Sequence, residues 1–391
     1  MSRGGTRKHL QKPDLITLIL VTLLVLFGLL CLLSAFAARF DGTETKLPLI
    51  LERLDFTYFS RQAFNVLLSI VVAIPLVFVD YHNYKPFIKS AFFGICVVLG
   101  ILLLVGENTR GILGWFKVGS RAFQPSEIAK VALIAASSKF CSEAADKYGG
   151  LRRFRDILVA LAYFALPFVL VLCQPDFGTA MLFVVIFLAV ALSAGLPWHY
   201  VALGFAAVIV LAPLTYRFLL TDTQQWRILV FLMPSLAPED AGYNVLRAKE
   251  LISSGGVFGK GFFAPGTFAQ TGYVPERHTD FIFSGIGEAA GMVGCLLLIV
   301  SFAILLFRWL YIAAKAPDRF GRCLVVGCSA MIAAHVFENI GMNLGIMPVT
   351  GIPLPFISYG GSNMLASLLA AAIVLSVQVH SVQKTALQAL R

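Results

Sequence analysis

The stretch Val274-Pro-Glu-Arg-His-Thr-Asp-Phe-Ile-Phe-Ser-Gly-Ile-Gly-Glu288 joins a long polar segment to a long apolar run. Arg277, His278 and Asp280 therefore fall where water gives way to hydrocarbon. An ionisable residue at that depth is costly, so it is a candidate functional residue. Thr279 or Asp280 could equally cap the following helix, because both residue types accept hydrogen bonds from the free N–H groups at a helix start. The stretch by itself leaves both interpretations open.

The composition indicates a membrane protein. Hydrophobic residues make up 58% of the 391 residues, charged residues make up 13%, and the mean hydropathy is +0.83. A soluble protein carries about 25% charged residues. The formal net charge of +10 would suit a nucleic-acid partner. The basic residues flank apolar runs, however, as the positive-inside rule describes, so we expect no nucleic acid.

Ten apolar runs come close to the length of about 20 residues that crosses a bilayer. They cover roughly residues 15–37, 62–80, 87–106, 125–142, 156–173, 177–195, 198–218, 280–308, 321–343 and 356–379. We therefore predict an all-α, polytopic protein with ten transmembrane helices, in one integral membrane domain over residues 1–391. A long extracytoplasmic loop, about residues 219–279, separates the seventh helix from the eighth.

The basic residues predict the orientation. The run that begins at Leu15 is too long for the hydrophobic region of a cleavable signal peptide, and basic residues precede it. It therefore predicts a retained first helix with a cytoplasmic N-terminus. An even number of spans places both termini on that side, where Lys and Arg are also most frequent in the short connections.

Metal-binding and disulfide patterns are missing from the sequence. The seven cysteines show no paired spacing, and the six histidines form no His-x-x-x-His pattern. Neither a disulfide framework nor a zinc site is therefore expected, and the cysteines are interpreted as small apolar packing residues.

Several polar segments share the predicted outer side with Asp280. The segment Gly106–Gln124 carries Arg110, Trp115, Lys117 and Arg121. A turn follows at residues 174–178, and a run rich in proline and glycine covers residues 345–361. The long loop contains an amphipathic helix, residues 243–252, followed by the stop signal Ser253-Ser-Gly-Gly256.

Two predicted helices carry polar residues with regular spacing. Glu127 and Lys130 are three residues apart, so they lie on one face, either as a functional pair or as a helix-start carboxylate beside a lysine that snorkels to the interface. Asp280, Ser284 and Glu288 recur every four residues and predict a stripe that faces a cavity or a neighbouring helix.

The run Met347-Pro-Val-Thr-Gly-Ile-Pro-Leu-Pro-Phe-Ile-Ser-Tyr-Gly-Gly-Ser362 cannot form a regular helix, because three prolines and two adjacent glycines interrupt it. Irregular backbone at membrane depth is tolerated only inside protein or along a cavity. Ser358, Tyr359 and Ser362 are therefore candidate ligands for a polar substrate. A re-entrant turn before the last helix explains the run equally well.

Together these segments resemble the SEDS family of bacterial cell-wall glycosyltransferases, which includes RodA, FtsW and SpoVE. The segments that carry the resemblance follow the family's order, and they are Phe123-Gln-Pro-Ser-Glu-Ile-Ala-Lys130, Gln174-Pro-Asp-Phe-Gly-Thr179, Gly242-Tyr243, Ser254-Gly-Gly-Val-Phe-Gly-Lys-Gly261, Pro275-Glu-Arg-His-Thr-Asp-Phe-Ile-Phe283, Gly287-Glu288, Asn339-Ile-Gly-Met342 and Pro348–Ser362. The segment Pro348-Val-Thr-Gly-Ile-Pro353 is most similar to the RodA branch, which acts in elongation.

The resemblance implies a ten-helix enzyme of the bacterial cytoplasmic (inner) membrane with an outward-facing active site. Such an enzyme polymerises lipid II into glycan strands, with inversion and release of undecaprenyl diphosphate. Its expected partners are a class B penicillin-binding protein and other membrane proteins of the elongation complex. The family's essential aspartate corresponds to Asp280, its functional tryptophan to Trp115, and its Glu/Lys pair to Glu127 and Lys130. Gly114 replaces a common family arginine.

The reaction requires a base and positive charge. Asp280 is the expected base for the attacking sugar hydroxyl. A diphosphate leaves as a stabilised anion, so the second carboxylic acid of an inverting glycosidase is not required. The groups expected to hold the diphosphate are Arg110, Lys117, Arg121, Lys130 and Arg277, and His278 is a further candidate for substrate binding. A divalent cation, Mg²⁺ or Mn²⁺, is a further source of positive charge, although no ligand cluster requires one.

Two other functions fit parts of the sequence. A flippase or transporter of lipid-linked precursors would also contain interrupted helices and intramembrane charges. It predicts charges near the bilayer midplane and an inverted repeat, whereas the charged motifs lie towards the outer side. A non-catalytic scaffold predicts that Asp280 is dispensable.

Overall fold

The computed structural model describes residues 11–35, 54–109, 112–118, 121–218, 225–226, 229–231, 233, 242–264, 267, 274 and 276–381. Arg110 and part of the predicted 219–279 loop therefore lie outside the described residues. Within the described ranges the chain is mainly helical.

Each of the ten predicted spans coincides with a helix. The helices are α1 (Leu15–Ala35), α3 (Phe56–Phe78), α4 (Lys85–Val105), α5 (Pro125–Tyr148), α6 (Phe154–Leu172), α7 (Phe177–Ser193), α8 (Trp198–Phe218), α12 (Ile282–Ala314), α13 (Arg319–Leu344) and α14 (Gly361–Val379). A 3₁₀ turn, η1 (Tyr81–Tyr84), precedes α4. Eight spans are long and apolar enough to cross a membrane, whereas α7 has only 17 residues and α5 is more polar. The count of ten crossings stays a prediction.

Aspartates and glycines delimit these helices. Asp55, Asp176 and Asp318 are the N-caps of α3, α7 and α13, and each carboxylate accepts a hydrogen bond from a backbone N–H of the first turn. Gly149 and Gly345 end α5 and α13 with φ of 72° and 70°, a conformation that glycine adopts without a steric penalty. The helix boundaries thus follow from local sequence.

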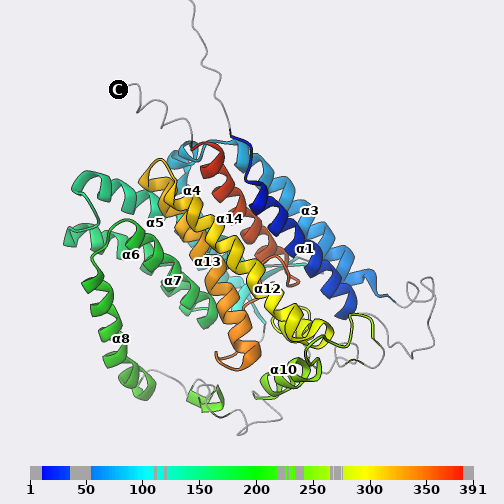
Figure 1. Cartoon of the computed structure of the whole chain (residues 1–391). Helices are drawn as coiled ribbons and strands as arrows, with labels where there is room; N and C mark the ends of the chain where they lie inside the picture. Colours follow the sequence, from blue (N-terminus) through cyan, green and yellow to red (C-terminus); the bar gives the residue numbers. More distant parts are fainter. Residues whose placement is uncertain are drawn as a thin grey trace, which may run out of the picture.

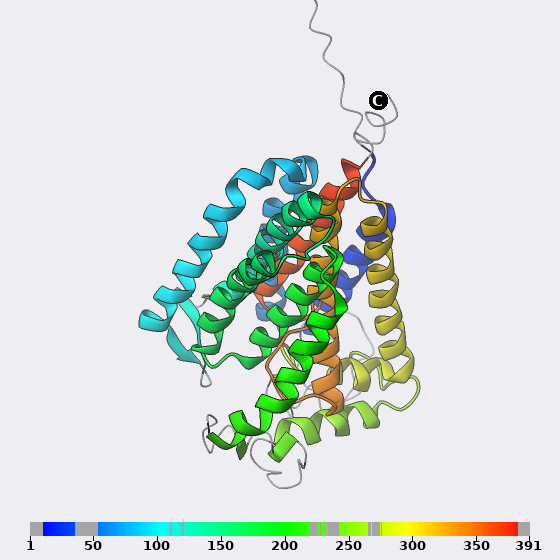
Figure 2. The same ribbon diagram turned by 90° about the vertical axis from the view of Figure 1, so that its left-hand side faces the viewer.

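The helices form one tilted bundle with α13 and α14 in its interior (Figure 1). Most residues of α14 are buried, whereas none of the described side chains of α8 is buried. Helix α8 stands at the edge of the bundle in Figure 1 and lies in front of it in Figure 2, where that side faces the viewer. The start of α1 and the end of α14 lie at the same end of the bundle, where the Gln11 N–H donates to the Val379 carbonyl at 3.1 Å. We call this the terminal end, and the opposite end, which contains Asp280, the site end.

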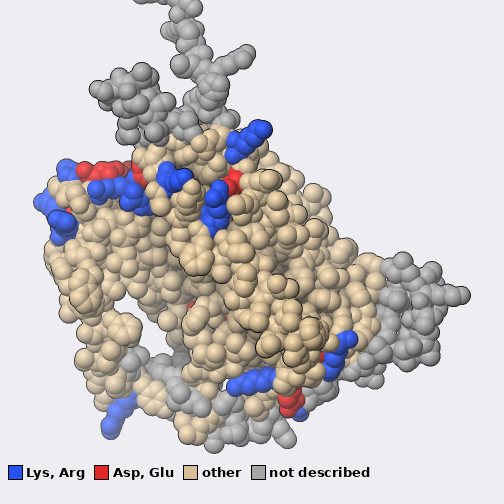
Figure 3. Space-filling model, in the orientation of Figure 1, with Lys and Arg blue, Asp and Glu red and all other residues tan. Residues whose placement is uncertain are grey.

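Charged side chains mark the two ends of the bundle. On the face shown in Figure 3, most Lys, Arg, Asp and Glu side chains lie towards the terminal end or the site end, and the belt between them is mainly uncharged. This distribution is what a protein spanning a hydrocarbon layer requires, because exposed charge in that layer is costly.

A small antiparallel sheet at the site end was not predicted. Strands β1 (Glu107–Thr109), β2 (Ile112–Val118) and β3 (Arg121–Phe123) pair in the order β1-β2-β3. Trp115 lies opposite Glu107, and Lys117 lies opposite Ala122. The strands are so short that no clear alternation of apolar and polar residues identifies them in the sequence.

Helix α12 is interrupted at Gly291, where φ is 65° and ψ is −165°. Residues 256–261 fill the break. The carbonyls of Glu288 and Ala289 accept hydrogen bonds from Lys260 and Gly261 at 2.9 Å each. The N–H groups of Met292 and Val293 donate to the carbonyls of residues 256 and 257 at 2.9 and 3.1 Å. The loop therefore replaces the helical hydrogen bonds that the break removes, as buried backbone requires.

The amphipathic helix predicted in the long loop is confirmed as α10 (Tyr243–Ser254). It packs against the first part of α12, where a Cβ on Gly287 would lie 2.9 Å from the Ile252 side chain. A Cβ on Gly255 would lie 1.9 Å from the Gly287 carbonyl oxygen. Glycine at both positions is therefore required for the close approach of α10 to α12.

Candidate functional site

Two irregular segments meet at the site end. One is the turn 276–281 before α12, and the other is the non-helical run 345–360 between α13 and α14. The Tyr359 N–H donates to the His278 carbonyl at 2.9 Å, and the Ser358 hydroxyl donates to the Thr279 carbonyl at 2.7 Å. The predicted irregularity of the second segment is confirmed, and several of its backbone groups form hydrogen bonds with other parts of the protein.

Asp280 belongs to the turn 276–281, lies beside the 345–360 segment, and is half-buried. Its carboxylate oxygen Oδ2 is 3.5 Å from the position that a Cβ on Gly351 would occupy. Gly351 has a φ of 73°, which disfavours any side chain at this position. The missing side chain leaves space directly beside the carboxylate.

The structure shows that neither Thr279 nor Asp280 is the cap of α12. The N-cap residue is Phe281, which forms no side-chain capping bond. The Ser284 N–H instead donates to the Asn343 amide oxygen on α13 at 3.0 Å. The capping interpretation of Asp280 was therefore wrong.

An aromatic cluster supports the turn on the other side. The ring of His278 lies 5.0 Å from the ring of Tyr58 on α3 and 5.7 Å from that of Tyr359. The rings of Tyr58 and Tyr359 are 5.3 Å apart in an edge-to-face arrangement. Pairs at such distances stabilise by about 0.5–1.5 kcal/mol beyond the burial of their surface. His278 and Tyr359 thus have a visible packing role, and their predicted contact with substrate stays a prediction.

Two predicted ligands have their hydroxyl groups engaged within the protein. Ser358 is fully buried, and its oxygen also accepts from the Leu354 N–H at 2.8 Å. The Ser362 oxygen accepts from the Gln124 N–H at 2.9 Å, which ties the start of α14 to the start of α5. Their roles in this geometry are structural, and substrate binding by either one stays a prediction.

Glu127 and Lys130 form a buried ion pair. The Lys130 ammonium donates to Glu127 Oε1 at 2.8 Å, and neither side chain is more than 2% exposed. The same ammonium lies 2.6 Å from His335 Nε2 on α13, and His335 Nδ1 lies 3.2 Å from the Pro353 carbonyl. A lysine that donates to Nε2 leaves the proton on Nδ1, which then donates to Pro353.

This burial changes the interpretation of the pair. The prediction that the two residues face each other is confirmed, but the snorkelling alternative is wrong, because the Lys130 ammonium points into the protein. In this arrangement the Lys130 ammonium has no exposed surface that a diphosphate could contact. Its substrate role stays a prediction, and its visible contacts connect α5, α13 and the 345–360 segment.

Two further buried acids surround Lys130. Asp176 Oδ2 accepts from Gln124 Nε2 at 3.2 Å, and Glu338 Oε2 accepts from the Thr350 hydroxyl at 3.4 Å. Burial raises the pKa of the Asp176 carboxyl, although the hydrogen bonds from Thr179 and the charge of Lys130 act in the opposite direction. The cluster concentrates negative charge around one lysine directly behind the segment that faces Asp280.

The segment Thr350–Ile352 lies between this cluster and Asp280. On one side a Cβ on Gly178, in the first turn of α7, would be 2.7 Å from the Thr350 side chain. On another side the Asn339 amide donates to the Ile352 carbonyl at 2.8 Å. The loop that borders the candidate base thus packs against the start of α7 and is hydrogen-bonded to α13.

The small sheet places the remaining predicted residues near the starts of α5 and α7. The Leu113 N–H donates to the Gln174 carbonyl at 3.3 Å, which joins β2 to the turn before α7. On β2, Trp115 is half-buried and Lys117 is exposed. Arg121 belongs to β3, and its side chain lies outside the described part of the structure. Lys117 is therefore a cation with access to solvent.

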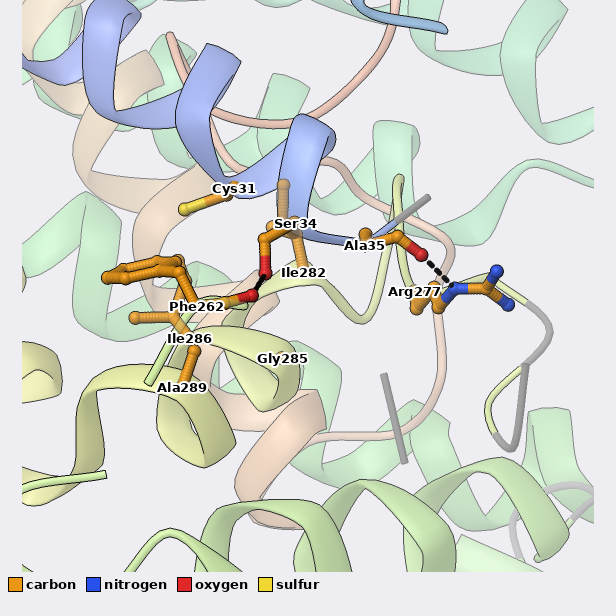
Figure 4. Close-up of a pocket in the computed structure, with 9 residues that line it drawn as sticks. All are labelled: Cys31, Ser34, Ala35, Phe262, Arg277, Ile282, Gly285, Ile286 and Ala289. Atoms are coloured by element: carbon orange, nitrogen blue, oxygen red, sulfur yellow. Dashed lines mark hydrogen bonds between the residues drawn. The ribbon is translucent and has the colours of Figure 1, made fainter. Parts of the chain in front are cut away.

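Arg277 borders a small pocket between the end of α1 and the start of α12 (Figure 4). Its Nε donates to the Ala35 carbonyl at 3.0 Å, and the Ser34 hydroxyl donates to the Phe262 carbonyl. Burial lowers the pKa of the Arg277 guanidinium. The pocket volume of about 10 Å³ admits roughly one water molecule, so it cannot take a sugar or a lipid chain.

The predicted stripe on α12 is partly confirmed. Ser284 and Glu288 are fully buried and face protein, and Glu288 Oε1 accepts from the Lys260 ammonium at 3.0 Å. Asp280 precedes the helix start at Ile282, so it does not belong to the stripe. Gly291 lies at the break in the helix.

Sequence reasoning missed the polar face of α13. His335, Asn339 and Asn343 recur every four residues, Glu338 lies three residues after His335, and all four are buried. The spacing argument that identified the α12 stripe would have identified this face. These side chains connect α13 to α5, to α12 and to the 350–353 segment.

Nearly the whole chain matches one protein family. A family model described as a cell cycle protein, covering FtsW, RodA and SpoVE, matches residues 14–383. The peptidoglycan glycosyltransferase MrdB of Escherichia coli K12 is 36% identical over 306 residues, which cover 77% of this chain and 79% of MrdB.

Two solved structures share the fold. One is a chain of a peptidoglycan synthase complex that coordinates polymerization and crosslinking, with a TM-score of 0.78, 28% identity, and coverage of 95% of this chain and 99% of that chain. The other is the rod shape determining protein RodA of Thermus thermophilus, with a TM-score of 0.68, 26% identity, and coverage of 95% and 98%.

Proposed function

Because this chain belongs to the FtsW, RodA and SpoVE family and is a peptidoglycan glycosyltransferase of the rod-shape type, we propose that it polymerises lipid II with Asp280 as the general base. The donor is a lipid II molecule or a growing strand linked to undecaprenyl diphosphate. The acceptor is a sugar hydroxyl of another such molecule. The product is a longer glycan strand.

The position of Asp280 carries this proposal. The carboxylate is half-buried beside the side-chain-free position of Gly351. The Asp280 carbonyl accepts a hydrogen bond from Asn339 on α13, and the neighbouring Thr279 carbonyl accepts one from Ser358 of the 345–360 segment. A fixed carboxylate with adjacent space is what a general base requires, since the base must come within hydrogen-bond distance of the proton it removes.

The reaction balances with one carboxylate. The acceptor hydroxyl oxygen forms a bond to the anomeric carbon of the donor sugar, and its proton passes to Asp280. The bond between the anomeric carbon and the diphosphate oxygen breaks, and the electron pair leaves with undecaprenyl diphosphate. Attack opposite to the leaving group inverts the anomeric configuration. The proton on Asp280 then returns to water.

The departing diphosphate requires positive charge. Lys117 is exposed on β2, and Arg277 lies three residues from Asp280. We propose these two as the first groups to test for diphosphate binding, because fixed cations stabilise developing negative charge. Among the described residues no group of three or more His, Cys, Asp or Glu could hold a metal ion, and a contribution from Mg²⁺ or Mn²⁺ stays a prediction.

The chain is a multi-pass protein of the inner membrane. We propose that the terminal end faces the cytoplasm and the site end faces outwards, as the distribution of basic residues predicts. The similarity to a peptidoglycan synthase complex supports a class B penicillin-binding protein as partner. Other elongation-complex membrane proteins are proposed partners on the same grounds.

The test is Asp280→Asn in purified protein supplied with lipid II. We expect glycan synthesis to fall by about 100-fold or more, the usual contribution of a general base. Asp55→Asn is the matched control, because Asp55 is an exposed cap at the same end and asparagine caps equally well. Undiminished polymerisation by well-folded Asp280→Asn would remove Asp280 from the mechanism. Lipid II translocation in sealed vesicles without polymer would favour the flippase alternative.

A further inference from the structure

We infer that Asn339 and Asn343 are positioning residues that fix the base Asp280 relative to the segment containing Gly351. Neither residue touches the Asp280 carboxylate in the hydrogen bonds seen here; both act on the backbone. The inference rests on the proposed role of Asp280, and the experiment below separates the failure of one from the failure of the other.

One amide nitrogen connects the two segments of the site. Asn339 Nδ2 donates to the Asp280 carbonyl at 2.9 Å and to the Ile352 carbonyl at 2.8 Å. An amide NH₂ group has two N–H donors, so this nitrogen uses one for each segment. A single side chain therefore bridges Asp280 and the residue next to Gly351.

A second amide supports the first. Asn343 Nδ2 donates to the same Asp280 carbonyl at 2.9 Å and to the Asn339 carbonyl at 2.8 Å. Its oxygen accepts from the Ser284 N–H at 3.0 Å, in the first turn of α12. Asn343 thus holds both the carbonyl of the candidate base and the start of the helix that follows it.

The turn itself holds one side of the peptide group that follows Asp280, because the Phe281 N–H donates to the Glu276 carbonyl at 3.1 Å, and the two asparagines hold the other side, the Asp280 carbonyl. Asp280 lies in a turn before the first helical residue, so helical hydrogen bonds do not hold its peptide group. Both asparagines are fully buried on α13, which is itself in the interior of the bundle. A rigid interior helix therefore transmits its position to the turn. Misplacement of a catalytic group by about 1 Å can cost roughly 100-fold in rate.

His335 extends the same device. It lies one helical turn from Asn339, and its Nδ1 is 3.2 Å from the Pro353 carbonyl. Two successive carbonyls of the 350–353 segment are thus held from α13. A purely stabilising role would not require these bonds to end on the residues that flank the candidate base.

The first experiment measures turnover of lipid II by purified Asn339→Ala. We expect kcat to fall roughly 10- to 100-fold and KM to change by less than about 3-fold, because the change affects the geometry of the base more than binding. Ser329→Ala is the matched control. It lies on the same helix, is equally buried, and donates only to the Val325 carbonyl of its own helix. Its kcat should stay near that of the wild type.

Asn343→Ala provides a second variant if Asn339→Ala does not fold. It leaves the Asn339 bridge between the Asp280 and Ile352 carbonyls in place, so we expect a smaller fall in kcat, about 3- to 10-fold. Melting temperature and the folded fraction are measured for each variant. A lower melting temperature with wild-type kcat in the folded fraction would overturn the inference.

A double-mutant cycle identifies the route of the effect. If Asn339 acts through Asp280, adding Asn339→Ala to Asp280→Asn should cause no further loss of the residual turnover. Losses that multiply would show that Asn339 acts independently, and they would overturn the inference. Full activity of Asp280→Asn alone would instead contradict the proposed function, whatever Asn339→Ala does.

Discussion

The terminal end and the site end use the same charged residue types in opposite ways. At the terminal end, Arg308 Nε donates to Asp14 at 3.0 Å, and His82 lies 2.8 Å from both Asp80 and Asp318. Arg308 and His82 are 31% and 29% exposed and reach water. At the site end, Lys130 and Glu127 are at most 2% exposed. The cations of the ion pairs at the terminal end are partly exposed, whereas both members of the pair at the site end are buried.

This difference teaches what the buried charges are for. An exposed ion pair contributes about 0–1 kcal/mol and costs little to form. Burying a pair costs several kcal/mol per ion, so a buried pair is weak evidence for stability. The enclosed charges of the site end are therefore best explained by the geometry they impose on the segment beside Asp280.

The largest expected effect is a loss of stability on substitution of Lys130, on helix α5, which runs from the site end towards the terminal end. Lys130→Met removes the only cation among the buried charges Glu127, Asp176 and Glu338 that the structure describes there. We expect a loss of about 3–5 kcal/mol in unfolding free energy, because a buried charge is left uncompensated. Thermal unfolding in detergent measures it.

The control for Lys130→Met is Lys139→Met, further along α5 towards the terminal end. Lys139 is partly exposed and donates to the Lys85 carbonyl at 2.8 Å. We expect a loss of no more than about 1 kcal/mol. Equal losses in the two variants would contradict the contrast between the two ends.

A second prediction concerns the packing of α10 on α12 at the site end. In Gly255→Ala the new Cβ would meet the Gly287 carbonyl oxygen at 1.9 Å, so backbone must move. We expect a loss of about 1–3 kcal/mol from overpacking, together with reduced polymerisation. Gly94→Ala is the control: no atom lies within 4 Å of its Cβ position on α4. There we expect a gain of about 0.5–1 kcal/mol. Similar melting temperatures for the two variants would refute this account.

The smallest expected effect is a pH dependence at the terminal end. Burial raises the pKa of Asp14, but the hydrogen bonds from Arg308 and Thr17 outweigh it and hold that pKa below the usual value. A depressed pKa means that the folded state favours the ionised form. Its stabilisation is present above the unfolded-state pKa, near 4, and is lost as the pH falls through the lower folded-state pKa.

This effect can be measured with Asp14→Asn. The difference in melting temperature between wild type and variant should be largest near neutral pH and should shrink below about pH 4. A difference that stays constant down to pH 3 would show that the carboxylate contributes no pH-dependent stability.

Much of the fold follows from local sequence. Hydrophobic runs predicted the position of every long helix, and Asp55, Asp176 and Asp318 end the connections as caps. The spacing of Glu127 and Lys130 correctly predicted that they meet. The small sheet was missed because its strands have three to seven residues and show no clear period.

The candidate site was only partly predictable. Asp280 was identified by its place at the water–hydrocarbon boundary, but its environment was not. The asparagines that hold its carbonyl are 59 and 63 residues away in sequence. No local pattern specifies which residue of another helix will reach a given carbonyl. The burial of Lys130 could not be predicted either, because a lysine near a helix end can point to the interface or into the protein.

The sequence by itself determined the class of the protein and its helices, and it supplied the candidate site residues, since insertion into hydrocarbon and capping depend on neighbours along the chain. Only the tertiary structure decided which charges are enclosed, where α12 breaks and how α13 holds Asp280 against the Gly351 segment. Those features depend on contacts between distant segments, and burial is a property of the packed bundle that no single segment possesses.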